Sequence, residues 1–301
     1  MPGVTRRTFI AGATGALVAP LAFSKERPMP MRTLGRTGRK VSLAGLGCVQ
    51  IGRRQLSETD AVRVVQRAVE LGITYIDTAQ QYGRGLSETR VGLALKDGLR
   101  DRVFLATKTL GRSYAAARKD LDGSLKRLQT DHVDLWQFHS LRSDRDTDAI
   151  LNGALRAGQE AVKAGRVRFL GITGHYDPQV FINALKRYDF STLLIPLNCI
   201  DPHNRSFEEH ALPFANEQKT GVIAMKVYCS GDLPKYVRAE DCLRYTYALP
   251  ISTCIVGCSS VREVELAVHV ARNLEQLKDD ERTTLLAKTK PHSPGLEWYK
   301  R

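Results

Sequence analysis

Residues 72–108 read GITYIDTAQQYGRGLSETRVGLALKDGLRDRVFLATK and contain two strand-like runs on either side of a helical pattern. The apolar runs at 73–76 and 103–107 are continuous rather than alternating, which is typical of strands in a parallel sheet covered by helices. Between them, the spacing from Ser87 onward predicts a helix over 87–99, and the same spacing predicts another helix over 150–165. A strand, a helix and a second strand in this order predict an α/β fold with parallel strands.

The same alternation continues along the chain. Eight strand-like runs are each followed by a helical pattern, and they lie at 45–47, 72–77, 103–108, 133–139, 168–173, 193–198, 221–227 and 252–257. Eight such units predict a (β/α)8 TIM barrel, and 301 residues accommodate the roughly 250 residues of that fold. A doubly wound sheet is the main alternative. It more often carries a GxGxxG turn after its first strand, and GLGCVQIG at 45–52 does not match that motif.

Both ends of the predicted barrel carry additional elements. Residues 31–47 form two extended runs around a glycine-containing turn, which predicts an N-terminal β-hairpin. Residues 279–289, DDERTTLLAKT, predict a C-terminal extra helix. We therefore expect the barrel to span residues 31–290 and residues 291–301 to form a C-terminal tail.

Residues 1–24 have the pattern of an export signal. Arg6 and Arg7 precede a mild apolar stretch that is too short to span a bilayer comfortably, and small residues follow near Ser24. This pattern is typical of a twin-arginine signal, with an ordinary basic N-terminus and an uncleaved membrane anchor as alternatives. We predict that the twin-arginine export machinery delivers the protein to the periplasm. No other segment is apolar enough to suggest a transmembrane span in the mature chain.

The composition narrows the classes of partner. The net charge is +13, but the basic residues are dispersed and no aromatic residues interleave with them. A solvated basic surface is the favoured interpretation, attraction of an anionic ligand is the second, and nucleic acid is not expected as a partner. The six cysteines form no CxxC pair and have no histidine in metal-ligand spacing, so we predict free thiols and no metal site.

Polar side chains stand at the carboxyl ends of three successive predicted strands. Asp77 ends the second strand, Lys108 the third and His139 the fourth, while Tyr82 lies in the loop after Asp77. In a barrel these ends meet at the face that carries the chemistry. A buried acid or amine is costly unless it is paired, so Asp77 and Lys108 are expected to form an ion pair. A purely structural ion pair is the alternative interpretation.

The ion pair suggests a chemical role for Tyr82. A free phenol has a pKa near 10, and a nearby ammonium lowers that value. We expect Lys108 to bring the pKa of Tyr82 to about 7, so that the phenol acts as a general acid. His139 would orient the same substrate oxygen. Loop packing of Tyr82 and a core position for His139 are the alternatives.

This ordered set of residues resembles the aldo-keto reductase family over residues 31–290. The resemblance implies a catalytic tetrad of Asp77, Tyr82, Lys108 and His139, and NADP(H) as cofactor, with NAD(H) as the alternative. It also implies hydride transfer to the carbonyl group of a small-molecule aldehyde or ketone, or the reverse reaction. A nicotinamide-binding sensor with little catalysis is the second hypothesis. A glycosidase is disfavoured because Asp77 has no second acid at a strand end.

The expected cofactor seat departs from the common family pattern. The segments GITGHYDP at 171–178 and GVIAMKV at 221–227 resemble a bacterial branch with TGH and MK signatures. Asn198, a shorter amide, replaces the usual glutamine after the sixth strand, and Met225 replaces the usual aromatic residue after the seventh. The resemblance assigns the cofactor to Thr173, Gly174, His175, Asn198, Met225, Lys226, Gly257, Ser259, Ser260 and Arg262.

Two details of the seat stay open at the sequence level. Arg262 is the one local candidate to bind a 2′-phosphate, while Ser260 and Glu263 are equally well explained as a helix-capping pair. The segment CSGDLPKY at 229–236 is short. It predicts that no large loop folds over the cofactor.

Overall fold

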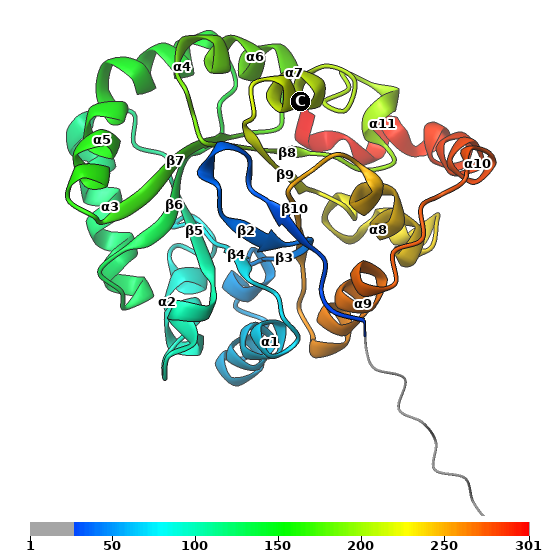
Figure 1. Ribbon diagram of the computed structural model, residues 1–301, viewed down its shortest axis with the longest axis horizontal. Coiled ribbons are helices and arrows are strands. Elements are labelled where there is room, and N and C mark those ends of the chain that lie inside the picture. The colour runs from blue at the N-terminus through cyan, green and yellow to red at the C-terminus, as the bar shows by residue number, and fades with distance from the viewer. Residues whose placement is uncertain (1–26, 301) are drawn as a thin grey trace, which may run out of the picture.

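Eight parallel strands close into a barrel in the computed structural model, which describes residues 27–300 (Figure 1). The strands follow one another in chain order, and the last pairs with the first to close the barrel. They are β3 (Ala44–Gly47), β4 (Tyr75–Asp77), β5 (Phe104–Thr109), β6 (Val133–Phe138), β7 (Val167–Thr173), β8 (Thr192–Pro196), β9 (Gly221–Met225) and β10 (Thr253–Gly257). The predicted (β/α)8 barrel is confirmed.

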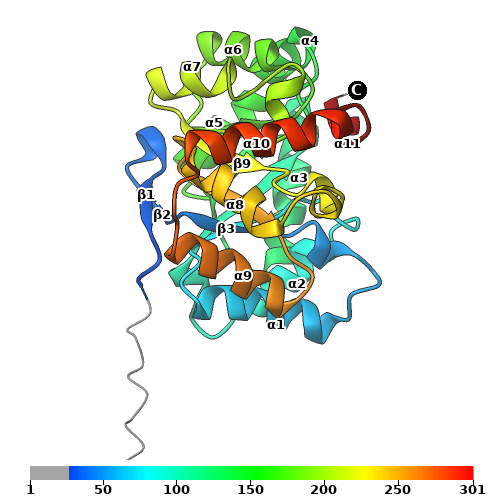
Figure 2. The ribbon, with the colours of Figure 1, turned by 90° about the vertical axis from the view of Figure 1, so that its right-hand side faces the viewer.

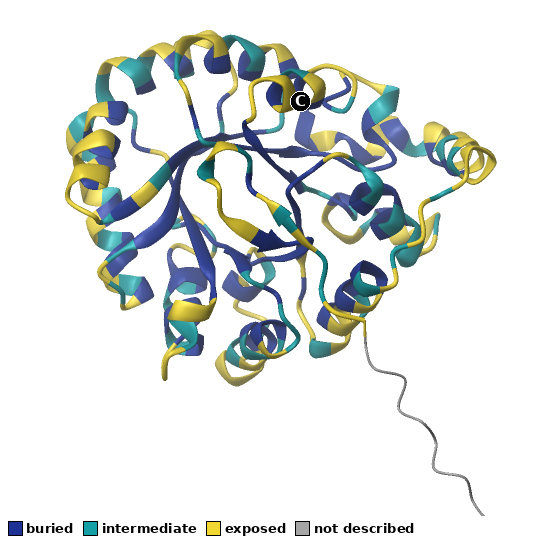
Figure 3. Cartoon of the chain, viewed as in Figure 1, coloured by how far each residue is buried: buried dark blue, intermediate teal, exposed yellow. Residues whose placement is uncertain are grey.

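Helices surround the barrel and bury their inner faces against it (Figures 1 and 3). They are α1 (Glu58–Glu70), α2 (Leu86–Ala94), α3 (Tyr114–Leu128), α4 (Asp144–Ala149), α5 (Leu155–Lys163), α6 (Pro178–Arg187), α7 (Ala211–Glu217), α8 (Ala239–Ala248), α9 (Val261–Arg272) and α10 (Asp279–Thr289). The ends of α1 follow ordinary capping chemistry. The Ser57 hydroxyl accepts from the amide of Asp60, and Gly72 follows the helix with a φ of +90°.

The predicted hairpin closes the amino-terminal end of the barrel. Its strands β1 (Met31–Thr33) and β2 (Lys40–Ser42) pair antiparallel and lie across one end of the barrel (Figures 1 and 2). Leu34 and Val41 are fully buried and pack with the apolar side chains inside the barrel. The chain passes so close to the start of β9 that a Cβ on Gly35 would lie 2.1 Å from the Gly221 nitrogen. This packing leaves the carboxyl-terminal end as the accessible one.

Two helices differ from their predicted bounds. The helix expected at 87–99 ends at Ala94, and a 3-10 turn at Leu99–Arg102 follows it. The helix expected at 150–165 begins earlier, as α4, and contains a π-helical turn at Ile150–Ala154 before α5. A π turn inserts one residue into the helical ladder, which hydrophobic periodicity does not reveal.

The segment expected as a C-terminal tail folds against the barrel. Residues 290–300 form a 3-10 turn at Lys290–His292, α11 (Ser293–Leu296) and a second 3-10 turn at Trp298–Lys300. Lys300 is fully buried and its ammonium pairs with Asp201 at 2.8 Å and with Glu297 at 2.7 Å. The segment is therefore an integral part of the packed structure.

The export-signal prediction falls on residues 1–24, which lie outside the described residues. Within residues 27–300, no helix has the length and apolar character needed to cross a membrane. All six cysteines are buried and free, in agreement with the predicted thiols.

Candidate active site

A buried hydrogen-bond chain links the ends of two neighbouring strands to the loop after β4. The Lys108 ammonium donates to Asp77 Oδ1, to the Thr78 carbonyl at 2.8 Å and to the Tyr82 hydroxyl at 3.1 Å. Asp77 and Lys108 are 0% and 1% exposed. β4 and β5 are adjacent in the barrel, which explains why residues 31 positions apart in sequence meet here. The predicted ion pair between Asp77 and Lys108 is confirmed, and Lys108 also donates a hydrogen bond to the Tyr82 phenol.

Gln137 is a further member of this chain that the sequence analysis missed. Its side-chain amide donates to Asp77 Oδ2 at 3.0 Å, so each carboxylate oxygen of Asp77 has a separate donor. Gln137 lies in β6 two residues before His139, on the strand face that points into the barrel. A polar residue within the apolar run VDLWQF was the signal that could have identified it.

Glycines allow the loop that carries Tyr82 to pack closely. Gly83, Arg84 and Gly85 all have positive φ values, of 63°, 57° and 93°. A Cβ on Gly83 would lie only 2.0 Å from the Gly52 carbonyl oxygen. Residues 83–85 thus form a tight turn that holds Tyr82 beside Lys108.

His139 follows β6 and faces the same cavity. Its backbone amide donates to the Thr109 carbonyl at 2.9 Å, and its ring meets the Tyr82 ring edge-on with centroids 6.1 Å apart. The side chain is only 7% exposed, yet its ring nitrogens make no hydrogen bond to any residue within 27–300. Buried imidazoles usually have partners. These nitrogens are therefore available to a ligand in the cavity.

The electrostatics of the chain correct one expectation. Burial raises the pKa of Tyr82 above its ordinary value, although the Lys108 ammonium acts in the opposite direction. The Asp77 carboxylate contributes to this result because its negative charge offsets that of Lys108 and disfavours the phenolate. The expected pKa of about 7 for Tyr82 is therefore wrong for the free protein. The phenol is neutral at physiological pH.

Burial and neighbouring charges also shift the pKa values of Lys108 and His139. Burial alone would lower the pKa of Lys108, but Asp77 and Tyr82 raise it above its ordinary value. Burial and the nearby Lys108 charge lower the pKa of His139 well below its ordinary value. At neutral pH the site thus contains an ammonium, a neutral phenol and a neutral imidazole.

A cavity of about 830 Å³ extends from these residues to the beginning of α9. Tyr82, Lys108 and His139 lie on its wall. Six of the residues assigned to the cofactor also line it, namely Thr173, His175, Met225, Lys226, Gly257 and Ser259. The cavity thus brings most of the predicted site residues together.

Four of the assigned residues lie elsewhere. Gly174 is packed so closely that a Cβ would lie 2.7 Å from the Leu141 carbonyl oxygen. The Ser260 hydroxyl caps α9 by accepting from the amide of Glu263, and Arg262 is exposed. These positions support the capping interpretation for Ser260. They leave Arg262 outside the cavity wall.

Asn198, the fourth, is fully buried behind the cavity. Its amide nitrogen donates to the Lys226 carbonyl at 3.0 Å and to the Tyr299 hydroxyl at 3.1 Å. Its oxygen accepts from the backbone amides of Ile200 and Asp201. Because all these bonds are internal, Asn198 joins the loop after β8 to the backbone after β9 and to the side chain of Tyr299. The assignment of Asn198 to direct cofactor contact is therefore not supported by its position.

The C-terminal segment contacts two residues of the cavity wall. His175 Nδ1 lies 3.0 Å from the Tyr299 carbonyl, which can only accept, so this nitrogen carries the ring proton. Burial lowers the pKa of His175 to about 4. The Lys226 ammonium lies 5.1 Å from the centre of the Trp298 ring. Sequence reasoning missed these contacts because it treated residues 291–301 as a tail.

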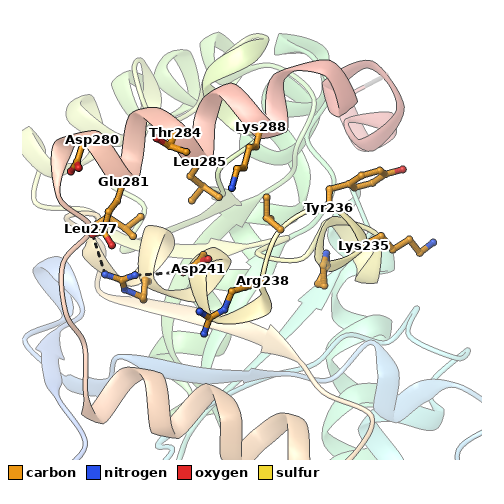
Figure 4. A pocket seen from close by; sticks show the side chains of 13 residues that line it. Lys235, Tyr236, Arg238, Asp241, Leu277, Asp280, Glu281, Thr284, Leu285 and Lys288 are labelled. Atoms are coloured by element: carbon orange, nitrogen blue, oxygen red, sulfur yellow. Dashed lines mark hydrogen bonds and ion pairs between the residues drawn. The ribbon is translucent and has the colours of Figure 1, made fainter.

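A second cavity of about 600 Å³ lies between α8 and α10 (Figure 4). On its wall Arg244 contacts Asp241 at 3.5 Å and Glu281 at 3.4 Å. Pro234 lines both cavities, so the short segment around it separates them. Tyr82 and Lys108 of the hydrogen-bond chain line the larger cavity and not the smaller one, so the larger cavity is the candidate active site.

Comparison with known proteins agrees with this fold and site. A family model described as "Aldo/keto reductase family" matches residues 44–245, which is more than half of the chain. The chain belongs to the aldo/keto reductase family.

Individual relatives give the degree of similarity. L-Galactose dehydrogenase of Arabidopsis thaliana is 32% identical over 294 residues, covering 84% of this chain and 91% of that protein. The holo form of aldo-keto reductase AKR11C1 from Bacillus halodurans superposes with a TM-score of 0.73 at 28% identity, covering 86% of this chain and 96% of the other. An aldo-keto reductase from Klebsiella pneumoniae in complex with NADPH gives 0.74 at 23% identity, with 87% and 96% covered. At that identity the last similarity concerns the fold.

Proposed function

We propose that the protein is an NADP(H)-dependent oxidoreductase that reversibly reduces aldehydes or ketones to alcohols. The observation that carries the proposal is the hydrogen bond from Lys108 to Tyr82, with the Tyr82 hydroxyl and the unpartnered His139 ring in one cavity. Lys108 Nζ donates to the phenol oxygen, so the phenol's own O–H remains available to donate. This arrangement suits protonation of a carbonyl oxygen.

The residues would divide the chemistry as follows. The neutral Tyr82 donates its proton to the carbonyl oxygen, and the Lys108 ammonium stabilises the phenolate that remains. Asp77 keeps Lys108 in place and charged. The neutral His139 donates one hydrogen bond to the same oxygen and orients the carbonyl group. A bound nicotinamide would supply the hydride.

The cavity contains groups that fit such a cofactor. The Thr173 hydroxyl lies on the wall, is buried and has no hydrogen-bond partner within the described chain, so it can bind a carboxamide. His175, with its proton on Nδ1, presents an acceptor at Nε2. Met225 and Lys226 would cover the ring and an anionic group, and Gly257 and Ser259 would contact the far end. NADP(H) is preferred in the proposal because a protein of the same fold is known with NADPH bound.

An assay of the full chain with NADPH and 4-nitrobenzaldehyde tests the proposal. We expect turnover, seen as loss of cofactor absorbance, and a decrease of about 100-fold or more in Tyr82→Phe with NADPH affinity retained. Lys108→Met combined with Asp77→Asn removes the charge without leaving a buried unpaired carboxylate, and should decrease the rate similarly. NADPH binding without turnover in the unaltered protein would instead favour the nicotinamide-binding sensor.

A further inference from the structure

Arg112 lies behind His139 and binds the backbone of the turn that carries it. Its Nη2 donates to the His139 carbonyl at 2.7 Å and to the Ser140 carbonyl at 3.4 Å. Its Nε contacts Asp146 at 3.2 Å, and the other oxygen of Asp146 accepts from the amide of Arg142 at 2.9 Å. Arg112 does not line the active-site cavity. The Arg112 guanidinium thus contacts the turn 139–142 directly through two carbonyls and indirectly through Asp146.

The backbone of Arg112 is fixed in turn by the π-helical turn at Ile150–Ala154. The amide of Ala154 donates to the Arg112 carbonyl at 2.9 Å instead of continuing the helical ladder. The approach is so close that a Cβ on Gly153 would lie 2.5 Å from that carbonyl oxygen. π turns often occur at functional sites because they redirect a backbone group. Here the redirected group supports Arg112.

The His139 ring depends on this support because it has no hydrogen bond of its own to a described residue. The next residue, Ser140, has a φ of +60°, a left-handed conformation that a non-glycine residue adopts only when its surroundings enforce it. The two carbonyls that Arg112 binds flank this strained position.

We propose that Arg112, held by the π turn, is a positioning residue that sets the orientation of His139 for carbonyl binding. The proposal rests on the proposed reductase function. A displacement of His139 by about 1 Å is enough to decrease catalysis as much as 100-fold.

The test compares Arg112→Met, Arg112→Lys and Gly153→Ala with Arg156→Met as the control. The Arg156 side chain is 75% exposed, and its substitution removes a surface ion pair with Glu160 and a contact with the Tyr114 ring, neither of which involves the turn 139–142. We expect kcat/KM for 4-nitrobenzaldehyde to decrease about 10- to 100-fold in Arg112→Met. We expect a smaller decrease in Arg112→Lys and Gly153→Ala, and no change in the control. NADPH affinity should stay unchanged in all four.

A double-mutant cycle separates positioning from general destabilisation. If Arg112 acts through His139, then Arg112→Met should change the rate by less than about 2-fold in a His139→Ala background. An equal decrease in both backgrounds would overturn the proposal. A readout independent of turnover is the NMR signal of the His139 ring in the cofactor-free protein. It should shift in Arg112→Met and not in Arg156→Met, and an unshifted signal contradicts the proposal even if the protein proves not to be a reductase.

Discussion

The protonation state of Tyr82 links the buried charges of the site to the direction of the reaction. Lys108 favours the phenolate, whereas burial and the Asp77 carboxylate favour the phenol, and the second influence is the larger. In the proposed mechanism, reduction of a carbonyl requires the phenol as proton donor, and oxidation of an alcohol requires the phenolate as acceptor. The neutral phenol of the free protein is therefore the form that the proposed reduction needs at neutral pH.

This balance predicts the pH dependence of both directions. The pKa of Tyr82 is raised above its ordinary value of 10.0, and that of His139 is lowered well below 6.5. Both working forms for reduction are thus fully populated between about pH 7 and pH 9, where kcat/KM should be constant. It should decrease only as the pH rises toward the pKa of the phenol, whereas the rate of oxidation should increase throughout this range. Initial rates in both directions measure this, and a reduction rate that falls near pH 7 would contradict it.

At the scale of single elements, the loop between β4 and α2 depends on the close contact of Gly83 with Gly52. Gly38, in the hairpin turn, offers a matched comparison because its φ of +67° is similar but nothing lies within 4 Å of its would-be Cβ. A difference in stability or activity between alanine variants at the two positions therefore reflects packing rather than backbone strain.

We predict that Gly38→Ala costs about 1 kcal/mol of stability and leaves the reductase rate unchanged. Gly83→Ala carries the same strain and also forces the loop away from Gly52, so it should displace Tyr82 and decrease the rate at least about 10-fold. Thermal unfolding and the NADPH assay measure the two effects. Equal behaviour of the two variants would show that the contact does not position Tyr82.

The sequence predicts some of these elements better than others, for physical reasons. Continuous apolar runs reveal parallel strands, and a strand-end position reveals Asp77 and Lys108, because burial imposes both patterns. The π turn leaves no mark on hydrophobic spacing, and Arg112 binds backbone carbonyls, which every residue has. The internal hydrogen bonds that occupy the Asn198 amide likewise depend on residues that are distant in sequence. Local pattern predicts elements and their inward residues, but not the contacts that fix them.

At the scale of the whole molecule, the C-terminal segment joins the last residues of the chain to the wall of the active site. Asp201 and Lys300 are each 0% exposed and form an ion pair, while the neighbouring Tyr299 binds Asn198 and His175. Removing one member of a buried ion pair leaves an uncompensated charge.

Lys300→Met should therefore decrease the free energy of unfolding by about 3–5 kcal/mol. The double variant Lys300→Met with Asp201→Asn should recover part of this loss, because it removes one of the two buried carboxylates that Lys300 contacts. Urea unfolding of the full chain measures both. A single variant as stable as the unaltered protein would show that the C-terminal segment contributes little to the fold.

Location is a second property of the whole molecule. We propose that Arg6 and Arg7 direct export by the twin-arginine route, which carries proteins that have already folded. Replacement of both by lysine should retain the protein in the cytoplasm, whereas the unaltered chain should be found in the periplasmic or membrane fraction. Cell fractionation followed by immunoblotting decides this. Identical distributions of the two proteins would refute the proposed signal.

The complete burial of six unpaired thiols makes their accessibility to a reagent a measure of how much of the protein is folded. A folded chain should be inert to a water-soluble thiol reagent, and an unfolded chain should take up one label at each cysteine. The number of labels per molecule then counts the unfolded fraction directly, with no denaturant and no cofactor. For a variant that has lost activity, the number of labels distinguishes a folded protein with an impaired active site from an unfolded one.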